Sequence, residues 1–257
     1  MRAARFTADD SNLSRSDRDE IFWALAYRLE LWTAIERSGQ TSISADESGP
    51  IIQRCIDDLT KIQLRSGSWF HEYANSFVTA TGVLSLHEAS ELSGNARSKS
   101  ALSSAVASLS RQRHLSGAFP YDESAQSTKY PPTVPASAGR MPLCEAAIFL
   151  GGKSSVVRLQ YAIESSFQNH RALDVAYKYD DHTDARNFSY GGFFFWFDMR
   201  GRKQAIDLLP ESPTKTKFAQ QLEAIVISKS EIDGCYVDSH EIGRCYGSAM
   251  ALLCLEK

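Results

Sequence analysis

The stretch Gln63-Leu64-Arg65-Ser66-Gly67-Ser68-Trp69 decides the interpretation of this sequence, because its Gly-x-aromatic ending recurs along the chain. A second copy, Gly117-Ala118-Phe119, lies fifty positions later, and a third, Gly234-Cys235-Tyr236, lies 117 positions after that. A glycine at such a place can adopt the left-handed conformation that ends a helix. Each copy follows one predicted helix and precedes another that is rich in small residues. A period of about fifty residues predicts a repeat made of helical hairpins.

Apolar residues outside these turns recur with the spacing of helices, and no segment alternates convincingly as a strand does. We therefore predict an all-α fold. The predicted helices cover residues 21–37, 51–64, 77–92, 102–109, 142–150, 156–167, 193–199, 218–227 and 248–255.

Composition divides these helices into two kinds. The helices that begin near residues 76–82 and 247–251 carry Gly, Ala, Ser and Thr, which permit close packing on all sides and suit an inner ring. Residues 160–167 and 220–227 carry a polar face and suit an outer ring. The expected fold is an α/α toroid of about five helical hairpins, formed by a single domain over residues 1–257. An open solenoid is the alternative.

Two segments stand apart from the repeat. Residues 1–17 are expected to be a loosely ordered amino-terminal segment. Residues 120–139 contain Pro131, Pro132 and Pro135 and are expected to form a long insertion loop, either over one rim or as a functional lid.

The composition excludes several classes of protein. Of the 257 residues, 43 % are hydrophobic and 23 % are charged, which are ordinary values for a globular protein. The net charge of −3 gives no basic excess, so no nucleic-acid partner is expected. No apolar stretch approaches the roughly 20 residues of a membrane span, so none is expected. Five scattered cysteines without a Cys-x-x-Cys pair, and an amino terminus without an apolar run, predict a cytoplasmic protein with free thiols.

The first repeat also carries a family resemblance. Gln63-x-x-x-Gly67-x-Trp69 resembles the Gln–Trp repeat of squalene-hopene and oxidosqualene cyclases, and Gln112 with the second turn forms a copy that is one residue longer. The helix at 80–89 and the end of the chain are similar to segments that accompany this motif. Over residues 50–257 the sequence therefore resembles the α/α toroid shared by terpenoid cyclases and the β subunits of protein prenyltransferases.

This resemblance implies a central cavity that is lined by aromatic residues and binds an apolar or isoprenoid-like small molecule. Aromatic rings stabilise cations, and the sequence crowds them between Phe188 and Phe197. If the inner helices run parallel, their amino termini meet at one rim, where N–H groups can hold an anion such as a diphosphate. The candidates for this rim are Tyr73, Asn75, Arg140, Cys144, Glu145, Tyr190 and Tyr246.

The catalytic motifs of these families are mostly missing. Proton-initiated cyclases carry an Asp-x-Asp-Asp tetrapeptide, which does not occur here. Protein prenyltransferases bind zinc through an Asp-x-Cys pair and a distant histidine; Asp233-x-Cys235 has the first spacing, but Gly247 stands where the histidine is expected. Asp233, Cys235 and His240 are nevertheless candidate zinc ligands, since three ligands and a water form a catalytic zinc site. The alternative is a glycine-centred turn with a buried cysteine.

A second possible metal site is acidic. The stretch Asp180-Asp181-His182-Thr183-Asp184 spells Asp-Asp-x-x-Asp, which binds magnesium and diphosphate in class I terpene synthases. Carboxylate oxygens are the ligands that Mg²⁺ prefers, so Asp180, Asp181 and Asp184 are candidate magnesium ligands. The alternative is an acidic loop in which Asp184 caps the next helix.

Two other functions are left open. A carbohydrate-active enzyme on the same scaffold needs two carboxylates across a cleft. A non-catalytic protein-interaction module is expected to have a cavity filled by Phe and Tyr side chains. The sequence alone does not decide between an enzyme and a binding protein. The candidate carboxylates for the carbohydrate hypothesis are Glu72, Asp122, Glu123, Glu145 and Asp238.

Overall fold

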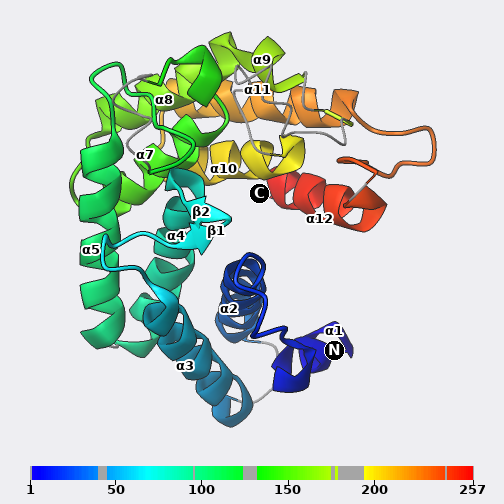
Figure 1. The fold of residues 1–257 in the computed structure, drawn as a ribbon. Helices are drawn as coiled ribbons and strands as arrows, with labels where there is room; N and C mark the ends of the chain where they lie inside the picture. Colours follow the sequence, from blue (N-terminus) through cyan, green and yellow to red (C-terminus); the bar gives the residue numbers. More distant parts are fainter. Residues whose placement is uncertain are drawn as a thin grey trace. The chain divides into compact units, whose positions relative to one another are not determined.

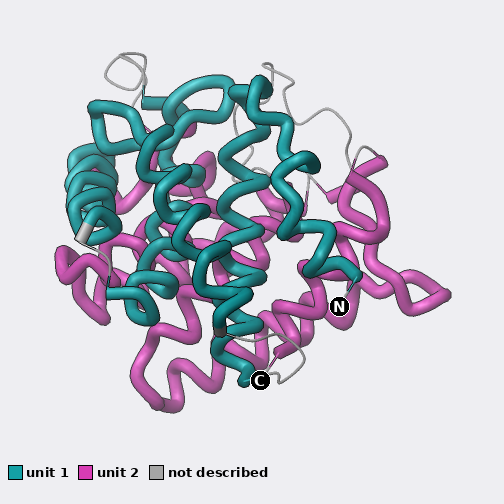
Figure 2. The backbone as a smooth tube through the Cα atoms, turned by 90° about the horizontal axis from the view of Figure 1, so that it is seen from below, with its two compact units in different colours: residues 1–112, 122–125 teal, residues 113–121, 126–257 magenta. Residues whose placement is uncertain are grey.

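The computed structural model divides the chain into two compact units that interleave along the sequence (Figure 2). Unit 1 contains residues 1–112 and 122–125, and unit 2 contains residues 113–121 and 126–257. The single domain expected from the sequence therefore has two compact parts. The structure describes residues 2–39, 45–94, 96–123, 132–174, 177–178, 194–240 and 242–256.

Unit 1 consists of helices with one short β-hairpin (Figure 1). Helix α2 packs against α3 and α4, and α4 packs against α5. In the hairpin, Phe70 pairs with Ala74 and His71 with Tyr73. The elements are α1 (Arg2–Ala8), η1 (Asp10–Asn12), α2 (Ile21–Ser38), α3 (Ala45–Ile62), β1 (Phe70–His71), β2 (Tyr73–Ala74), α4 (Ser76–Ser93) and α5 (Ala96–Gln112).

The described part of unit 2 is helical throughout. Helix α7 packs against α8 and α10, and α10 packs against α11 and α12. The all-α class expected from the sequence is confirmed. The elements are η2 (Pro135–Ser137), α7 (Arg140–Leu150), α8 (Val156–Gln168), α9 (His170–Asp174), α10 (Phe195–Asp207), α11 (Pro213–Ser228) and α12 (Gly243–Leu255).

The two kinds of helix predicted from composition are both present. Helix α4 is buried without interruption from Ser76 to Leu86, and α7 is buried at every position from Arg140 to Ile148. Helix α11 instead buries only Phe218, Leu222 and Val226, a single stripe at every fourth residue. Small side chains in α4 allow the close approach: a Cβ on Gly82 would lie 2.8 Å from the Trp69 ring.

The Gly-x-aromatic turn has the same hydrogen bonds in all three copies. In the first, the Leu64 N–H donates to the Ser68 carbonyl at 2.9 Å, and the Gly67 N–H donates to the Leu64 carbonyl at 2.9 Å. The glycine is left-handed each time, with φ of 93°, 83° and 79°. The matching bonds are written here from the N–H to the carbonyl. In the second copy they are His114 to Ala118 (2.9 Å) and Gly117 to His114 (2.9 Å). In the third copy they are Glu231 to Cys235 (2.8 Å) and Gly234 to Glu231 (2.9 Å).

The aromatic residue of each turn is tied to the element that follows it. The backbone N–H of the aromatic residue donates to a hydroxyl in or just before the next small-residue helix. The predicted repeat is therefore visible as a local structure of turn and helix together. These bonds are Trp69 to Thr79 Oγ1 (3.2 Å), Phe119 to Ser137 Oγ (2.9 Å) and Tyr236 to Ser248 Oγ (3.1 Å).

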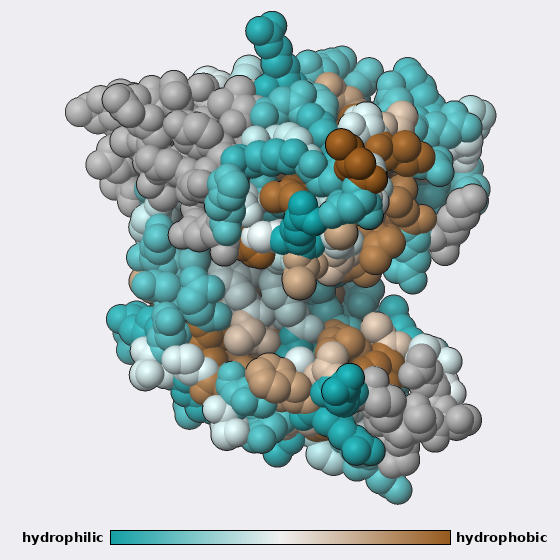
Figure 3. Space-filling model, turned by 90° about the vertical axis from the view of Figure 1, so that its right-hand side faces the viewer, coloured by the Kyte–Doolittle hydropathy of each residue, from teal (hydrophilic) through white to brown (hydrophobic). Residues whose placement is uncertain are grey.

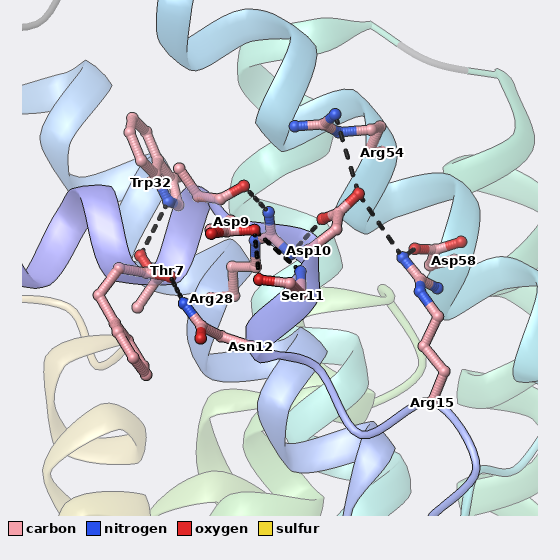
Figure 4. A network of polar contacts seen from close by, with 12 residues as sticks. Thr7, Asp9, Asp10, Ser11, Asn12, Arg15, Arg28, Trp32, Arg54 and Asp58 are labelled. Atoms are coloured by element: carbon pink, nitrogen blue, oxygen red, sulfur yellow. Dashed lines mark hydrogen bonds and ion pairs between the residues drawn. The ribbon is translucent and has the colours of Figure 1, made fainter.

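The amino-terminal segment contains short helices. Residues 2–12 form α1 and η1, which are held on the rest of unit 1 by a polar network (Figure 4). The Arg28 Nη1 donates to Asp10 at 2.7 Å, and Nη2 donates to the Ala8 carbonyl at 2.6 Å. These polar contacts join residues far apart in the sequence, so hydrophobic periodicity does not reveal them.

Other differences concern the ends of elements. Helices α3 and α5 are longer than predicted, and the two-residue strands were not predicted. The described part of the proline-rich segment 120–139 includes η2, where Ser137 is buried; residues 124–131 lie outside the described residues. Within the described chain, no helix has the length and apolar character needed to cross a membrane.

Candidate functional site

Of the predicted rim residues in unit 1, Asn75 has a structural role. Its side chain is fully buried. Its Oδ1 accepts the Val78 N–H at 3.0 Å and so caps α4, while Nδ2 donates to the carbonyls of His71 and Tyr73. Tyr73 is 41 % exposed, and partial burial, followed by the charge of Glu72, raises the pKa of its hydroxyl.

Arg140 of unit 2 is buried and supports the second Gly-x-aromatic turn. Its Nε donates to the Phe119 carbonyl at 3.0 Å, and Nη2 donates to the Ala136 carbonyl at 2.7 Å. Its guanidinium also lies 5.6 Å from the centre of the Tyr121 ring. Burial lowers the pKa of this arginine. The side chain predicted to hold a diphosphate is therefore bonded to backbone carbonyls.

The other rim residues of unit 2 divide between core and surface. Cys144 is fully buried, and Glu145 is buried in an ion pair with Arg113, whose Nη1 lies 2.7 Å from Glu145 Oε1. Tyr246 is half-buried, with its ring centre 6.5 Å from that of Phe194. Tyr190 lies outside the described residues.

The predicted zinc site is not formed. Among the residues that the structure describes, no group of three or more His, Cys, Asp or Glu side chains is placed to hold a metal ion. Asp233 instead pairs with Arg244 and accepts the Cys235 N–H within the third turn. The glycine-centred turn is present, as in the alternative for this motif, but Cys235 is half-buried and not buried as that alternative expected. The candidate magnesium ligands Asp180, Asp181 and Asp184 lie outside the described residues.

Two of the carboxylates considered for carbohydrate chemistry are bonded inside the protein, as Glu145 is. Glu123 accepts hydrogen bonds from Ser68 Oγ (2.7 Å), Ser108 Oγ (2.6 Å) and Gln112 Nε2 (2.9 Å). Asp238 is fully buried and accepts the Trp196 N–H at 3.0 Å. Asp238 therefore lies inside the structure, whereas Glu123 is half-buried and bonded to unit 1.

A set of aromatic rings packs together in unit 1 and is here called the aromatic surface: half-buried Trp23 and Tyr27 of α2, half-buried His71 of the hairpin and fully buried Phe77 of α4. The Trp23 ring stacks on Tyr27, with centres 6.0 Å apart, and on Phe77, with centres 6.3 Å apart. His71 meets Trp23 edge-on at 5.6 Å. Such stacked rings present flat apolar faces with a few polar atoms.

Trp23 differs from the other three tryptophans. Trp32, Trp69 and Trp196 are fully buried, whereas Trp23 is only half-buried. Each buried indole also donates its N–H inside the protein. The acceptors are Thr7 Oγ1 at 3.1 Å, the Leu59 carbonyl at 2.8 Å and the Val237 carbonyl at 2.9 Å.

Sequence reasoning missed the aromatic surface, although a signal was present. Trp23 and Tyr27 are four residues apart on α2 and lie off the predicted apolar stripe of Ile21, Leu25 and Leu29. Two large aromatic residues outside the core stripe of an amphipathic helix indicate a binding face. In the aromatic-rich segment 188–197, the described residues Phe195, Trp196 and Phe197 are core and Phe194 is half-buried.

Unit 2 also exposes apolar side chains. Leu252 and Leu253 of α12 are 64 % and 40 % exposed, and Ile232 in the preceding turn is fully exposed. The side of the molecule on which α12 lies in Figure 1 is drawn in Figure 3, where hydrophobic residues reach the surface among polar ones. These residues are aliphatic, so they form no stacked set like that of the aromatic surface.

Two buried groups of unit 2 make stability depend on pH in opposite senses. Burial raises the pKa of the Asp238 carboxyl to about 6. Burial and then the charge of Arg202 lower the pKa of His170 to about 4. Asp238 therefore favours the folded state below pH 4, and this contribution is lost as the pH rises to 6. His170 contributes in the opposite direction, losing stability as the pH falls from 6.5 to 4.

We expect the free energy of unfolding of the wild type to change little between pH 4 and 6, because these two contributions oppose each other. Asp238→Asn should make stability rise with pH in this window, and at pH 8 it should be more stable than the wild type by about 2–3 kcal/mol. His170→Gln should make stability fall as the pH rises. Urea unfolding at several pH values measures the stability of the wild type and of both variants. If the stability of Asp238→Asn had the same pH dependence as that of the wild type, Asp238 would not be the group whose titration changes stability.

Comparisons of the chain with protein-family models, with curated proteins and with solved structures found no match.

Proposed function

We propose that the protein binds an apolar, isoprenoid-like small molecule on the aromatic surface, within a chain folded as an α/α toroid. The toroid is supported by the alternation of almost fully buried helices with amphipathic ones, and by the identical hydrogen bonds of the three turns. The aromatic surface belongs to α2, α4 and the hairpin. Helix α4 is of the inner kind, whose free faces line the centre of a toroid.

The single observation that carries this proposal is the half-buried Trp23, stacked between Tyr27 and Phe77. Stacked aromatic faces offer dispersion contact to an apolar chain and stabilise positive charge that develops on it. Ligand sites for apolar molecules are lined mainly by apolar and aromatic side chains with a few polar groups, and this set has that composition.

An apolar ligand is favoured over a carbohydrate because several of the candidate acids, and one acid of α2, are bonded to protein donors. Glu30 of α2 accepts a hydrogen bond from Ser85 Oγ at 3.0 Å. Glu123, Glu145 and Asp238 are each bonded to protein donors. A glycosidase needs two carboxylates that face a substrate across a cleft, whereas Glu145 and Asp238 are buried and half-buried Glu123 is bonded to three side chains.

The test is a titration with farnesol, followed by tryptophan fluorescence and by calorimetry. We expect the wild type to bind and Trp23→Leu to bind at least about tenfold more weakly, since the variant loses the stacked ring. Phe6→Leu is the matched control: Phe6 is an aromatic residue of the same unit, 63 % exposed, outside the aromatic surface. Its affinity should equal that of the wild type.

Two outcomes would overturn the proposal. One is the absence of farnesol binding by the folded wild type. The other is an equal affinity in Trp23→Leu, which would place binding elsewhere. A parallel titration with cellohexaose separates the classes of ligand: binding of the sugar that depends on Trp23, without binding of farnesol, would favour the carbohydrate hypothesis.

A further inference from the structure

The three Gly-x-aromatic turns differ in what covers them. In the first copy α5 lies against the turn, and a Cβ on Gly67 would lie 2.7 Å from the carbonyl carbon of Ser104. In the second copy α8 takes this place, and a Cβ on Gly117 would lie 3.0 Å from the Tyr161 ring. In the third copy nothing in the described chain lies within 4 Å of a Cβ on Gly234. The third turn is therefore open where the first two are covered by a helix.

Hydrogen bonds to the turns show the same difference. In the first copy, Arg111 Nη2 of α5 donates to the Ser66 carbonyl, just before the glycine, at 2.8 Å. In the second copy, the Tyr161 hydroxyl of α8 donates to the equivalent carbonyl, that of Ser116, at 3.2 Å. The equivalent carbonyl of the third copy belongs to Asp233, and among the residues that the structure describes no group donates to it. An acceptor that is bonded twice by a covering helix is thus left available in the third copy.

Helix α12, the small-residue helix of the third copy, has an uncovered side. Its counterparts α4 and α7 are buried over residues 76–86 and 140–148, and each packs against the helix that follows it in the chain. Helix α12 packs against α10 and α11, which both precede it. Its buried residues, at 247, 250, 251 and 254, lie on one side. The opposite side exposes Cys245, Ala249, Leu252 and Leu253.

We propose that α12 and the third turn bind one amphipathic helix of another polypeptide, in the place that α5 and α8 occupy in the other two copies. Stacked repeats bury their apolar faces against their neighbours, and an amphipathic helix is a common occupant of such a face. The chemistry of the occupant follows from α5 and α8, which both present stripes of alanine and aliphatic residues. The buried apolar residues are Ala101, Ala105, Val106 and Leu109 of α5, and Leu159, Ala162 and Ile163 of α8.

An arginine beside the turn is the expected polar anchor of the bound helix. The residue before the glycine is Asp233 in the third copy, where the other two copies have serine. The Asp233 side chain is 50 % exposed and pairs with Arg244. An arginine that bonds the Asp233 carbonyl, as Arg111 bonds the Ser66 carbonyl, would also lie near this carboxylate. Bonds to a charged acceptor are stronger than neutral ones, so arginine is favoured over tyrosine at this place.

The test uses a fluorescein-labelled peptide of residues 96–112, which carries the apolar stripe of α5 and Arg111. Fluorescence anisotropy measures its binding to the full chain. We expect the wild type to bind the peptide, and Leu252→Glu to bind it at least about tenfold more weakly, because the new carboxylate would be buried without a partner. Arg111→Ala in the peptide should weaken binding about three- to tenfold through loss of the bond to the turn.

Val157→Glu is the matched control. Val157 of α8 is an aliphatic residue of unit 2 that is 73 % exposed, and it lies outside the third copy. This variant should bind the peptide as the wild type does. The absence of binding by the folded wild type would overturn the proposal, and so would an equal affinity in Leu252→Glu.

Two further measurements identify a different occupant. Leu252 is 64 % exposed, so Leu252→Glu alone should change Tm by no more than about 3 °C. A larger fall would show that the chain itself covers this face, and would overturn the proposal. Light scattering would also overturn it by showing a wild-type dimer that Leu252→Glu dissociates, because a second molecule of this protein would then be the occupant.

This inference rests on the three turns and not on the binding of an isoprenoid-like molecule. The aromatic surface belongs to α2, α4 and the hairpin, and the proposed helix site belongs to α12 and the third turn. Trp23→Leu should therefore bind the peptide with the affinity of the wild type, and Leu252→Glu should leave the titration with farnesol unchanged. Failure of either proposal can thus be told apart from failure of the other.

Discussion

Replacement of Arg113 by methionine is expected to lower the free energy of unfolding by about 3–5 kcal/mol. Arg113 Nη1 lies 2.7 Å from Glu145 Oε1, and the two side chains are 15 % and 3 % exposed. Ser154 also donates its hydroxyl to the same carboxylate. Without the guanidinium, Glu145 would keep a buried negative charge with a single neutral donor. Urea unfolding of the variant, with the slope compared to that of the wild type, measures the loss.

A double-mutant cycle separates the loss of the pair from the cost of the uncompensated charge. Arg113→Met with Glu145→Met should recover much of the stability, because two apolar side chains leave no buried charge behind. The pair of Lys203 and Asp207, also 2.7 Å apart, is the comparison, because its carboxylate is 53 % exposed. Lys203→Met should cost less than about 1 kcal/mol. A loss at Arg113 no larger than the loss at Lys203 would contradict the prediction.

Gly67→Ala is expected to lower the free energy of unfolding by about 2–4 kcal/mol. Gly67 has a φ of 93°, which is costly for alanine. A Cβ at this position would also lie 2.7 Å from the carbonyl carbon of Ser104 and closer still to its oxygen. These are backbone atoms of helix α5, which cannot rotate away as a side chain can. Either the turn or the helix must therefore move. Chemical unfolding measures the effect.

Gly234→Ala provides a control that is specific to the turn. Gly234 occupies the same position in the third copy, with a φ of 79°, but nothing lies within 4 Å of an added Cβ. This variant should lower the free energy of unfolding only by the cost of alanine in the left-handed conformation, about 1–2 kcal/mol. The difference between the two variants therefore isolates the close approach of α5. Equal losses would show that the backbone conformation alone accounts for the effect.

The sequence predicted those features that depend on local patterns. The Gly-x-aromatic turns, the helices beside them and the contrast between small-residue and amphipathic helices follow from glycine conformation and helical periodicity. These physical effects act within a few residues. The closed ring depends on how successive hairpins are placed, which local periodicity does not determine, and it stays a proposal.

The candidate site was less accessible to such reasoning. Arg140 and Glu145 were expected at a rim, but both are buried and bonded within unit 2. A charged residue in an apolar helix looks the same in sequence whether it faces a ligand or another part of the protein. The sequence also did not reveal that Arg202 Nε and Nη1 are buried without a hydrogen-bond partner. Whether a buried polar group finds a hydrogen-bond partner depends on its three-dimensional surroundings.

The contacts of Glu123 bear on how the chain can be divided. Residues 122–123 belong to unit 1. Asp122 forms an isolated antiparallel β-bridge with Asn75, and the Glu123 N–H donates to the Ala74 carbonyl at 2.8 Å. Residues 113–121, which precede them, belong with unit 2. Proteolytic cleavage directly after α5 would therefore separate Glu123 from the rest of unit 1, where its carboxylate accepts hydrogen bonds from three side chains. Cleavage after Glu123 would instead separate residues 113–121, which contain the second Gly-x-aromatic turn, from the rest of unit 2. No single cleavage releases both units whole, so limited digestion should yield fragments that stay non-covalently associated.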